Sequence, residues 1–128
     1  MAHSRPRPTD AELEILDVLW RRGPSTVRQV HDELSEDRGV GYTTVLKLMQ
    51  IMFDKGLLTR NESQRSHVYR ARDRQEVTQQ RLVKDLLARA FGGSTEKLVM
   101  QALSAKRATA EELDEIRRML DELSGGDA

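Results

Sequence analysis

Four hydrogen-bonding side chains recur on one side of residues 42–54 when this segment is drawn as a helix. They are Thr43, Thr44, Lys47 and Gln50. At about 100° per residue these positions share one helix face. Side chains of this length and type contact base edges and phosphates from a helix that lies in the major groove of DNA. The spacing therefore predicts a DNA-recognition helix, whose chemistry is hydrogen bonding and charge pairing.

The opposite side of this recognition helix is apolar. Its stripe consists of Val45, Leu48, Met49, Met52 and Phe53. Their spacing is that of a helix face packed against other helices. Gly56 stands where a left-handed cap would end the helix, and Lys55 precedes it at the negative end of the helix dipole. We therefore expect the stripe to be buried and the chain to turn at Gly56.

A short hairpin follows this turn. Residues 57–62 and 67–71 each have the composition of a short strand, and residues 63–66 form a polar turn with Arg65 at its tip. We call this hairpin the wing. Because its tip is basic, we expect it to contact phosphates beside the recognition helix.

Positive charge is concentrated around these two elements. The whole chain is neutral, with 21 Lys and Arg against 21 Asp and Glu. Residues 41–74, in contrast, hold seven basic and three acidic residues, a local net charge of +4. The basic ones are Lys47, Lys55, Arg60, Arg65, Arg70, Arg72 and Arg74. Charged helices and hairpins are commonly plain solvated surface. The order of amphipathic helix, glycine stop and basic hairpin is what favours DNA binding.

Composition argues against several other functions. The chain of 128 residues has no cysteine, which excludes disulfides, thiol redox chemistry and thiolate metal sites. The three histidines, His3, His31 and His67, lack metal-ligand spacing. No G-x-S-x-G motif or glycine-rich phosphate loop indicates an enzyme, and no small-molecule substrate is evident. We therefore expect no catalysis, cofactor or metal. Without a secretion signal or a run of about 18 apolar residues, a cytoplasmic protein is expected.

Two short helices are predicted before the recognition helix. Residues 1–8 form a flexible basic arm, either a leader or cloning remnant or a segment that enters a minor groove. Thr9 with Glu12, and Thr26 with Gln29, form the capping boxes that begin the helices. The first ends at Gly23 and the second at about Ser35. Their apolar stripes are Leu13, Leu16, Leu19 and Trp20, and Val27, Val30 and Leu34.

Three further helices are predicted after the wing, within residues 73–124, before a flexible tail at 125–128. Helices of this size bury too little apolar surface to be stable alone. A second copy of the chain supplies the missing surface under twofold symmetry. The candidate dimerisation residues are Leu82, Leu86, Leu98, Leu103, Leu113, Ile116 and Leu120. The alternative is that these helices pack back onto the amino-terminal part as one monomeric domain.

With these elements in place, the chain resembles the BlaI/MecI family of bacterial repressors, known from the control of penicillinase and methicillin resistance. The resemblance covers roughly residues 9–123 and lies in "PTDAELEILDVLW", "GPSTVRQV", "YTTVLKLMQIMFDKGLL" and "SHVYRA". As a set, the pattern of Trp20, Gly23-Pro24, Thr43-Thr44, Lys55-Gly56 and Tyr69 is specific.

The resemblance implies a winged helix, a carboxy-terminal dimerisation domain and repression by operator binding. It places recognition contacts at Thr43, Thr44 and Lys47, and wing contacts near Arg65, Ser66 and His67. It also implies relief by a membrane sensor metalloprotease that detects a β-lactam and cleaves the dimerisation part. Where the resistance repressors have Asn-Phe at the cleavage point, this chain has Gln101-Ala102, and it has Ile51 where they carry a basic residue.

Taken together, the sequence predicts a mainly α chain with a winged helix-turn-helix domain at residues 9–72, including a small β hairpin. An all-α dimerisation domain follows at residues 73–124. The predicted function is a homodimeric repressor that binds a palindromic double-stranded DNA operator. The candidate DNA contacts are Tyr42, Thr43, Thr44, Lys47, Gln50, Arg65, Ser66 and His67. The alternative is a winged-helix module that binds another protein without sequence-specific DNA binding.

Overall fold

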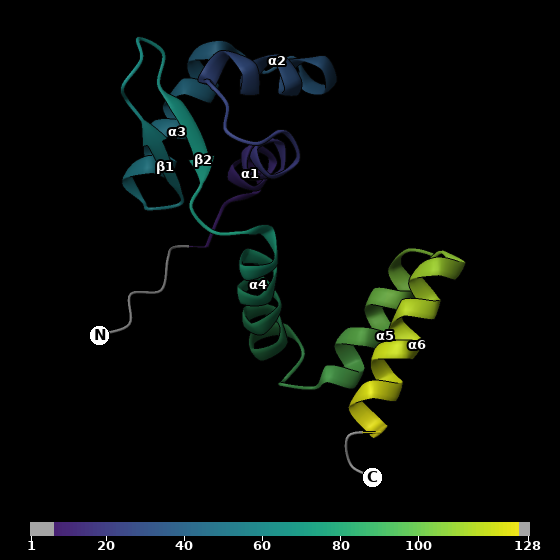
Figure 1. Cartoon of the computed structure of the whole chain (residues 1–128). Coiled ribbons are helices and arrows are strands. Elements are labelled where there is room, and N and C mark those ends of the chain that lie inside the picture. Colours follow the sequence, from purple (N-terminus) through teal and green to yellow (C-terminus); the bar gives the residue numbers. More distant parts are fainter. Residues whose placement is uncertain (1–6, 126–128) are drawn as a thin grey trace. The chain divides into compact units, whose positions relative to one another are not determined.

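The computed structural model describes residues 7–125, except for the side chains of residues 37 and 38. The expected arm at residues 1–8 and tail at residues 125–128 lie outside this range, apart from residues 7, 8 and 125. The helices are α1 (Asp10–Arg22), α2 (Val27–Arg38), α3 (Tyr42–Asp54), α4 (Gln75–Ala90), α5 (Thr95–Ala105) and α6 (Ala110–Gly125), and the strands are β1 (Leu58–Asn61) and β2 (Val68–Ala71) (Figure 1). The prediction of a mainly α chain with one small hairpin is confirmed.

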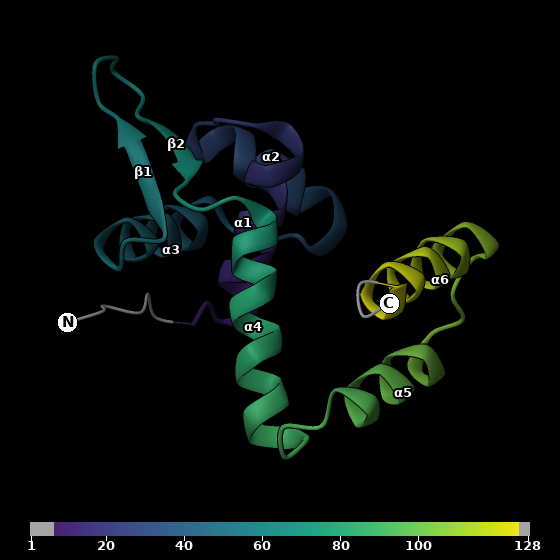
Figure 2. The same ribbon diagram turned by 60° about the horizontal axis from the view of Figure 1, so that its bottom comes forward.

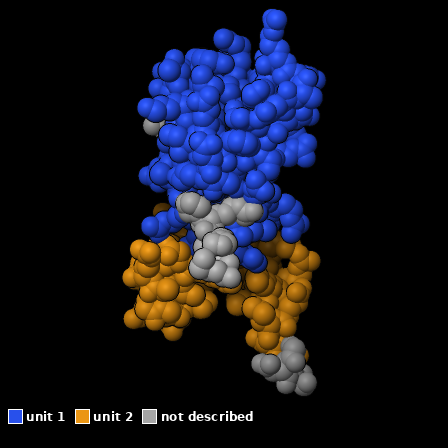
Figure 3. All heavy atoms as spheres, turned by 90° about the vertical axis from the view of Figure 1, so that its left-hand side faces the viewer, with its two compact units in different colours: residues 1–82 blue, residues 83–128 orange. Residues whose placement is uncertain are grey.

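The chain divides into two compact units, Met1–Leu82 and Val83–Ala128 (Figure 3). We call them the amino-terminal unit and the carboxy-terminal unit and describe each by itself. The division falls inside α4. Our boundary between residues 72 and 73 lies earlier in the chain, at the end of the wing, and stays a prediction.

Capping boxes begin α1 and α2, as predicted. The Thr9 side chain accepts a hydrogen bond from the Glu12 backbone at 3.2 Å, and the Glu12 carboxylate accepts one from the Thr9 backbone at 2.9 Å. Thr26 and Gln29 repeat both bonds. Reciprocal bonds of this kind satisfy two backbone N–H groups that a helix start leaves without partners.

The predicted end of α2 at about Ser35 is wrong. The helix continues to Arg38 and ends on Gly39, which has the left-handed backbone angles φ 63° and ψ 33°. The polar residues after Ser35 are compatible with a helix, so the helix ends only where a glycine adopts the left-handed conformation.

The core of the amino-terminal unit lies between α1, α2, α3 and the hairpin. Its buried apolar residues are Ile15, Leu16, Val18, Leu19, Val27, Val30, Val45, Met49, Met52, Leu57, Leu58 and Tyr69. The predicted stripe of α3 faces this core, with Leu48 and Phe53 at its edge. The stripe predicted for α1 also packs against the core, with Leu13 and Trp20 half-buried at its edge, but it was incomplete. Ile15 and Val18, which the stripe omitted, are fully buried because α1 packs against α2, α3 and β2 together.

The wing is an antiparallel hairpin with Leu58 opposite Ala71 and Asn61 opposite Val68 (Figures 1 and 2). Both strands are shorter than predicted, so residues 62–67 form the connecting loop. Tyr69 exchanges two backbone hydrogen bonds with Ser25, at 2.8 and 2.9 Å. Strand β2 of the wing is therefore attached to the segment that joins α1 and α2.

The first turns of α4 belong to the amino-terminal unit and are connected to α1 through Asp73, which lies just before the helix. The indole N–H of Trp20 donates to the backbone carbonyl of Asp73 at 3.0 Å. The carboxylate of the same residue accepts a hydrogen bond from Arg81 Nη1 at 2.7 Å. These bonds connect the end of α1 with the start of α4.

The carboxy-terminal unit contains helices that have little buried surface. No residue of α5 or α6 is buried, although Ser94 caps α5 and Thr109 forms a reciprocal capping pair with Glu112 on α6. Large apolar side chains of α4, α5 and α6 are exposed instead. They are Val83, Leu86, Val99, Met100, Leu103, Met119, Leu120 and Leu123. These helices are well defined locally but bury none of their apolar stripes completely.

Candidate DNA interface

Helix α3 has its buried apolar stripe on one side and the predicted polar contacts on the other side, where Ile51 is also exposed. Val45, Met49 and Met52 have no exposed surface. The candidate contacts Tyr42, Thr43, Thr44, Lys47 and Gln50 are all exposed. The geometry therefore brings the five predicted side chains onto an accessible surface of one helix.

A buried ion pair at the carboxy-terminal end of α3 fixes this helix to α1. The Glu12 side chain is almost completely buried, and both of its carboxylate oxygens accept from Lys55 Nζ, at 2.9 and 3.0 Å. Gly56 follows with a φ of 85°, and Leu57 N donates to Met52 O at 2.9 Å. The predicted glycine turn is present. Lys55, however, belongs to an internal ion pair and not to the exposed face.

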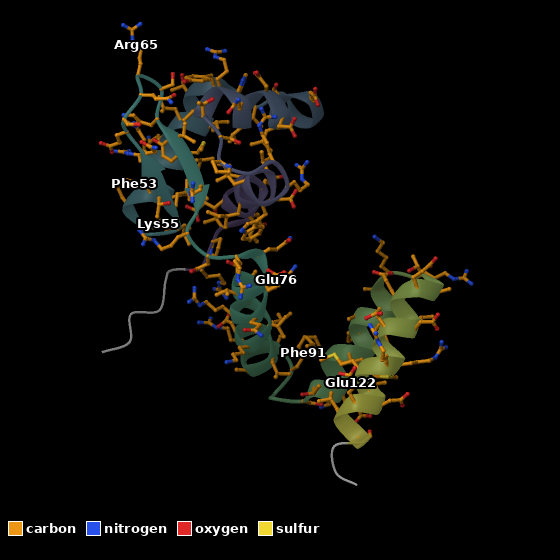
Figure 4. All side chains as sticks on the ribbon, in the orientation of Figure 1. Phe53, Lys55, Arg65, Glu76, Phe91 and Glu122 are labelled. Carbon is orange, nitrogen blue, oxygen red and sulfur yellow. The ribbon has the colours of Figure 1, made fainter. Side chains whose placement is uncertain are left out.

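The tip of the wing holds the second group of candidates. Arg65 and Ser66 are exposed in the loop, and His67 is half-buried at its end. Figure 4 shows the Arg65 side chain at the outermost point of the loop, directed away from the hairpin. Asn61 Oδ1 accepts from Ser63 N at 2.9 Å and so fixes the start of this loop. The predicted position of Arg65 at the tip agrees with the structure.

The Arg60 side chain, in contrast, packs against and bonds to residues of the wing and of α3. Its guanidinium carbon lies 3.9 Å from the centroid of the Phe53 ring, and Arg60 Nη1 is 3.4 Å from the Tyr69 hydroxyl. Its Nε donates to the Glu62 carboxylate, a bond that raises the pKa of Arg60 and lowers the pKa of Glu62. This stacked and paired guanidinium joins the end of α3 to both strands.

The local positive charge is thus divided between internal and available residues. Lys55 and Arg60 have carboxylate partners, and Arg72 Nε donates to the Gly56 carbonyl at 2.9 Å. Among the described residues, no carboxylate pairs with the other basic side chains counted from the sequence. These are Lys47, Arg65, Arg70 and Arg74. The charge available to an anionic partner is therefore carried by α3, the wing and the segment after it.

One further cation lies beside α3 and was missed in the sequence. Arg28, exposed on the first turn of α2, places its guanidinium carbon 4.8 Å from the centroid of the Tyr42 ring. A position inside a capping box, here between Thr26 and Gln29, is an ordinary surface position in sequence. Only the packing of α2 on α3 brings Arg28 to the first residue of the recognition helix.

The predicted dimerisation residues lie on α4, α5 and α6, and none is buried. Leu86, Leu103 and Leu120 are exposed, and Leu82, Leu98, Leu113 and Ile116 are half-buried. Gln101 and Ala102 are exposed inside the regular helix α5.

Candidate metal sites and membrane-spanning helices are both absent from the described residues. Across residues 7–125, no three His, Asp or Glu side chains are grouped so that they could hold a metal ion. In the same part of the chain, no helix has both the length and the apolar character needed to cross a bilayer.

Comparison with known proteins agrees with this geometry. The family model of the penicillinase repressor matches residues 8–122. The transcriptional regulator BlaI of Mycobacterium tuberculosis (strain ATCC 25618 / H37Rv) is 35% identical over 118 residues, which cover 91% of this chain and 85% of that protein. The penicillinase repressor of Bacillus licheniformis is 25% identical over 117 residues, covering 91% of each.

A solved structure supports the fold of the DNA-binding part. The solution structure of the DNA-binding domain of the repressor BlaI matches with a TM-score of 0.51 and 26% identity, over 58% of this chain and 90% of that chain. The predicted winged helix is confirmed by this match. The chain belongs to the penicillinase repressor family and is a transcriptional repressor of the BlaI type, not an enzyme.

Proposed function

We propose that the chain represses transcription as a homodimer that binds a palindromic operator, with α3 in the major groove and the wing against the DNA backbone. The observation that carries the proposal is the two-sided α3. It exposes Lys47 and the polar first turn while Val45, Met49 and Met52 are completely buried. A helix held in this way presents a fixed set of donors and acceptors to base edges.

The exposed residues take different parts in this proposal. Lys47 contacts a base edge or a phosphate from the middle of the exposed face, and Gln50 extends that face by one turn. At the start of α3, the DNA backbone is contacted by Tyr42, Thr43 and Thr44. Around the wing loop, Arg65 binds phosphate, with Ser66 and His67 beside it.

The proposed dimer is supported by the carboxy-terminal unit. Leu120 has 57% of its surface exposed, and Leu123 has 64%. Burying a leucine side chain contributes about 1.5–3 kcal/mol, so covering several of these side chains offers a substantial driving force for association. A second copy provides the same apolar stripes under twofold symmetry, and that symmetry gives the operator its palindrome.

Proteolysis by a membrane sensor metalloprotease is the proposed means of relieving repression. The candidate bond between Gln101 and Ala102 lies in α5, so cleavage there requires local unfolding of this helix. Cutting the dimerisation part removes the affinity that comes from linking two half-sites. In cells treated with cell-wall antibiotics, a fragment ending near Gln101 is expected. An intact chain under derepressing conditions contradicts this part of the proposal.

Selection from a random duplex library tests the DNA-binding proposal and works for an operator of any sequence. The selected sequences are expected to contain an inverted repeat, and binding is expected to weaken steeply with salt because phosphate contacts release counterions. Sedimentation of the free protein is expected to show a dimer. A monomer at working concentration, or a selected pool without twofold symmetry, counts against the homodimer.

Substitutions then test the assigned surface. Lys47→Ala and Arg65→Ala are each expected to weaken binding to the selected operator at fixed salt. Arg89→Ala is the matched control, because Arg89 is an exposed cation of α4 paired with Asp85, far along the chain from α3. If the first two variants bind within twofold of the unmodified protein, the assigned surface is wrong. If the protein shows no salt-dependent retention on heparin, the alternative that the winged helix binds another protein is favoured.

A further inference from the structure

Arg28 is an exposed cation of α2 for which the described residues provide no carboxylate partner. Asp32, four residues further along α2, lies beside the His31 ring instead, with Oδ1 3.3 Å from Nδ1. The guanidinium of Arg28 is placed over the Tyr42 ring, 4.8 Å from its centroid. An ordinary surface ion pair therefore does not account for the position of this side chain.

The Tyr42 ring is held from two directions. Arg28 lies over its face, and the His31 ring meets it edge-on at 5.8 Å and 72°. Both partners come from α2, whereas Tyr42 is the first residue of α3. The ring is 37% exposed, so this cluster lies at the surface and is not sealed in the core. It connects the two helices at the start of the exposed α3 face.

Stacking leaves the hydrogen-bonding edge of the guanidinium available. An arginine that lies on an aromatic face uses the plane of the group, while its five N–H donors point outward around the rim. The stack also restricts a long side chain whose rotamer freedom would otherwise be lost only on binding. A guanidinium that is positioned before binding is suited to a phosphate, which it meets with two parallel hydrogen bonds.

We propose that Arg28 binds a phosphate of the DNA backbone, with Tyr42 as the residue that positions it. The inference deepens the proposed function and rests on it. In helix-turn-helix proteins the helix before the recognition helix crosses the backbone while the recognition helix occupies the groove. Arg28 lies on that preceding helix, beside the residue that directly precedes Thr43 and Thr44. The interface thus extends from α3 and the wing onto α2.

The test measures binding of the full-length protein to the selected operator and to an unrelated duplex across a salt series. Because a phosphate contact carries no sequence information, Arg28→Ala is expected to weaken binding to both duplexes by a similar factor, roughly fivefold to tenfold. Because each subunit of the proposed dimer loses one phosphate contact, the slope of log affinity against log salt is also expected to fall by about 1.8. Arg28→Lys, which keeps the charge, is expected to retain the slope and to bind with intermediate affinity.

Tyr42 is tested through its coupling to Arg28. Tyr42→Ala is expected to weaken binding in the unmodified protein and to have a smaller effect in the Arg28→Ala background, because the stacked pair is then already lost. Tyr42→Phe keeps the ring, so Arg28→Ala is expected to weaken binding in the Tyr42→Phe background by the same factor as in the unmodified protein. Additive losses from Arg28→Ala and Tyr42→Ala would refute the positioning role.

The outcomes separate this inference from the proposed function. If Lys47→Ala weakens operator binding while Arg28→Ala stays within twofold with an unchanged salt slope, Arg28 is not a phosphate contact and the proposed function stands. If Lys47→Ala and Arg65→Ala are also without effect, the proposed DNA surface fails as a whole. A loss for Arg28→Ala confined to the selected operator also overturns the phosphate role. Arg89→Ala controls for the change in net charge.

Discussion

The ion pair between Glu12 and Lys55 makes a prediction that distinguishes charge for stability from charge for DNA binding. Glu12 is 2% exposed and its carboxylate has two donors, Lys55 Nζ and the Thr9 backbone N–H. Lys55→Met removes the first donor and leaves a buried carboxylate with one neutral hydrogen bond. Glu12→Gln instead removes the charge and keeps an acceptor for Thr9, and Lys55 can then turn toward water.

The size of each effect follows from burial. Losing one member of a buried ion pair costs about 3–5 kcal/mol because the other charge stays buried. The Lys55 side chain is 28% exposed, so water partly replaces it and we expect a loss of about 2–3 kcal/mol for Lys55→Met. For Glu12→Gln we expect about 1–2 kcal/mol. The double variant is expected to lose less than the sum, with a coupling of about 1–2 kcal/mol.

Urea unfolding followed by tryptophan fluorescence measures these losses. Trp20 is the only tryptophan of the chain, and its indole bonds to Asp73 within the amino-terminal unit. Its fluorescence therefore reports the unit that contains the ion pair. At temperatures where the variant is folded, Lys55→Met is expected to keep the salt slope of DNA binding, since Lys55 is not on the exposed face. An unchanged unfolding midpoint together with a reduced salt slope would refute the reasoning.

Three further predictions concern other parts of the chain. Leu120→Asp places a charge on an exposed apolar stripe and is expected to give monomers by sedimentation with the helical signal retained. Arg118→Asp on the polar side of α6 is the control, and an intact dimer of Leu120→Asp would contradict the proposed interface. Gly39→Ala is expected to lower the unfolding free energy by about 1 kcal/mol, because the left-handed φ of 63° disfavours a side chain although no atom obstructs it. Hydrogen bonds from Thr109 lower the pKa of Glu112, so the ionised carboxylate stabilises α6 above the ordinary glutamate pKa, and this stabilisation is lost as pH falls through the lowered value. Acidification is therefore expected to reduce the helicity of Glu112→Gln less than that of the unmodified protein, and an equal change would contradict this.

Local signals predicted much of the fold. The capping boxes at Thr9 and Thr26 and the turn at Gly56 need only nearby residues, and each is present. The two-sided composition of α3 likewise gave its buried and exposed faces, since helical periodicity alone determines which side chains share a face. The DNA contacts assigned to the exposed face stay a prediction.

Features that depend on distant contacts were missed. Lys55 was counted with the exposed charge because its partner Glu12 is 43 residues away. Ile15 and Val18 were omitted from the α1 stripe because that helix is covered from several sides at once. The stack of Arg28 on Tyr42 depends on how α2 crosses α3, and no spacing in the sequence specifies that crossing.

The wing combines a strand, β2, that is bonded on both edges with a tip that extends away from the strands. Its strand β2 is bonded to Ser25 on one side and to β1 on the other, whereas Arg65 is at the outermost point of a loop of polar residues. Mutations in the tip can therefore accumulate with little penalty to folding. On the proposed phosphate role of Arg65, relatives that keep the same scaffold can adjust the overall strength of DNA binding by varying these few positions, and a designer can graft alternative tips onto the same hairpin.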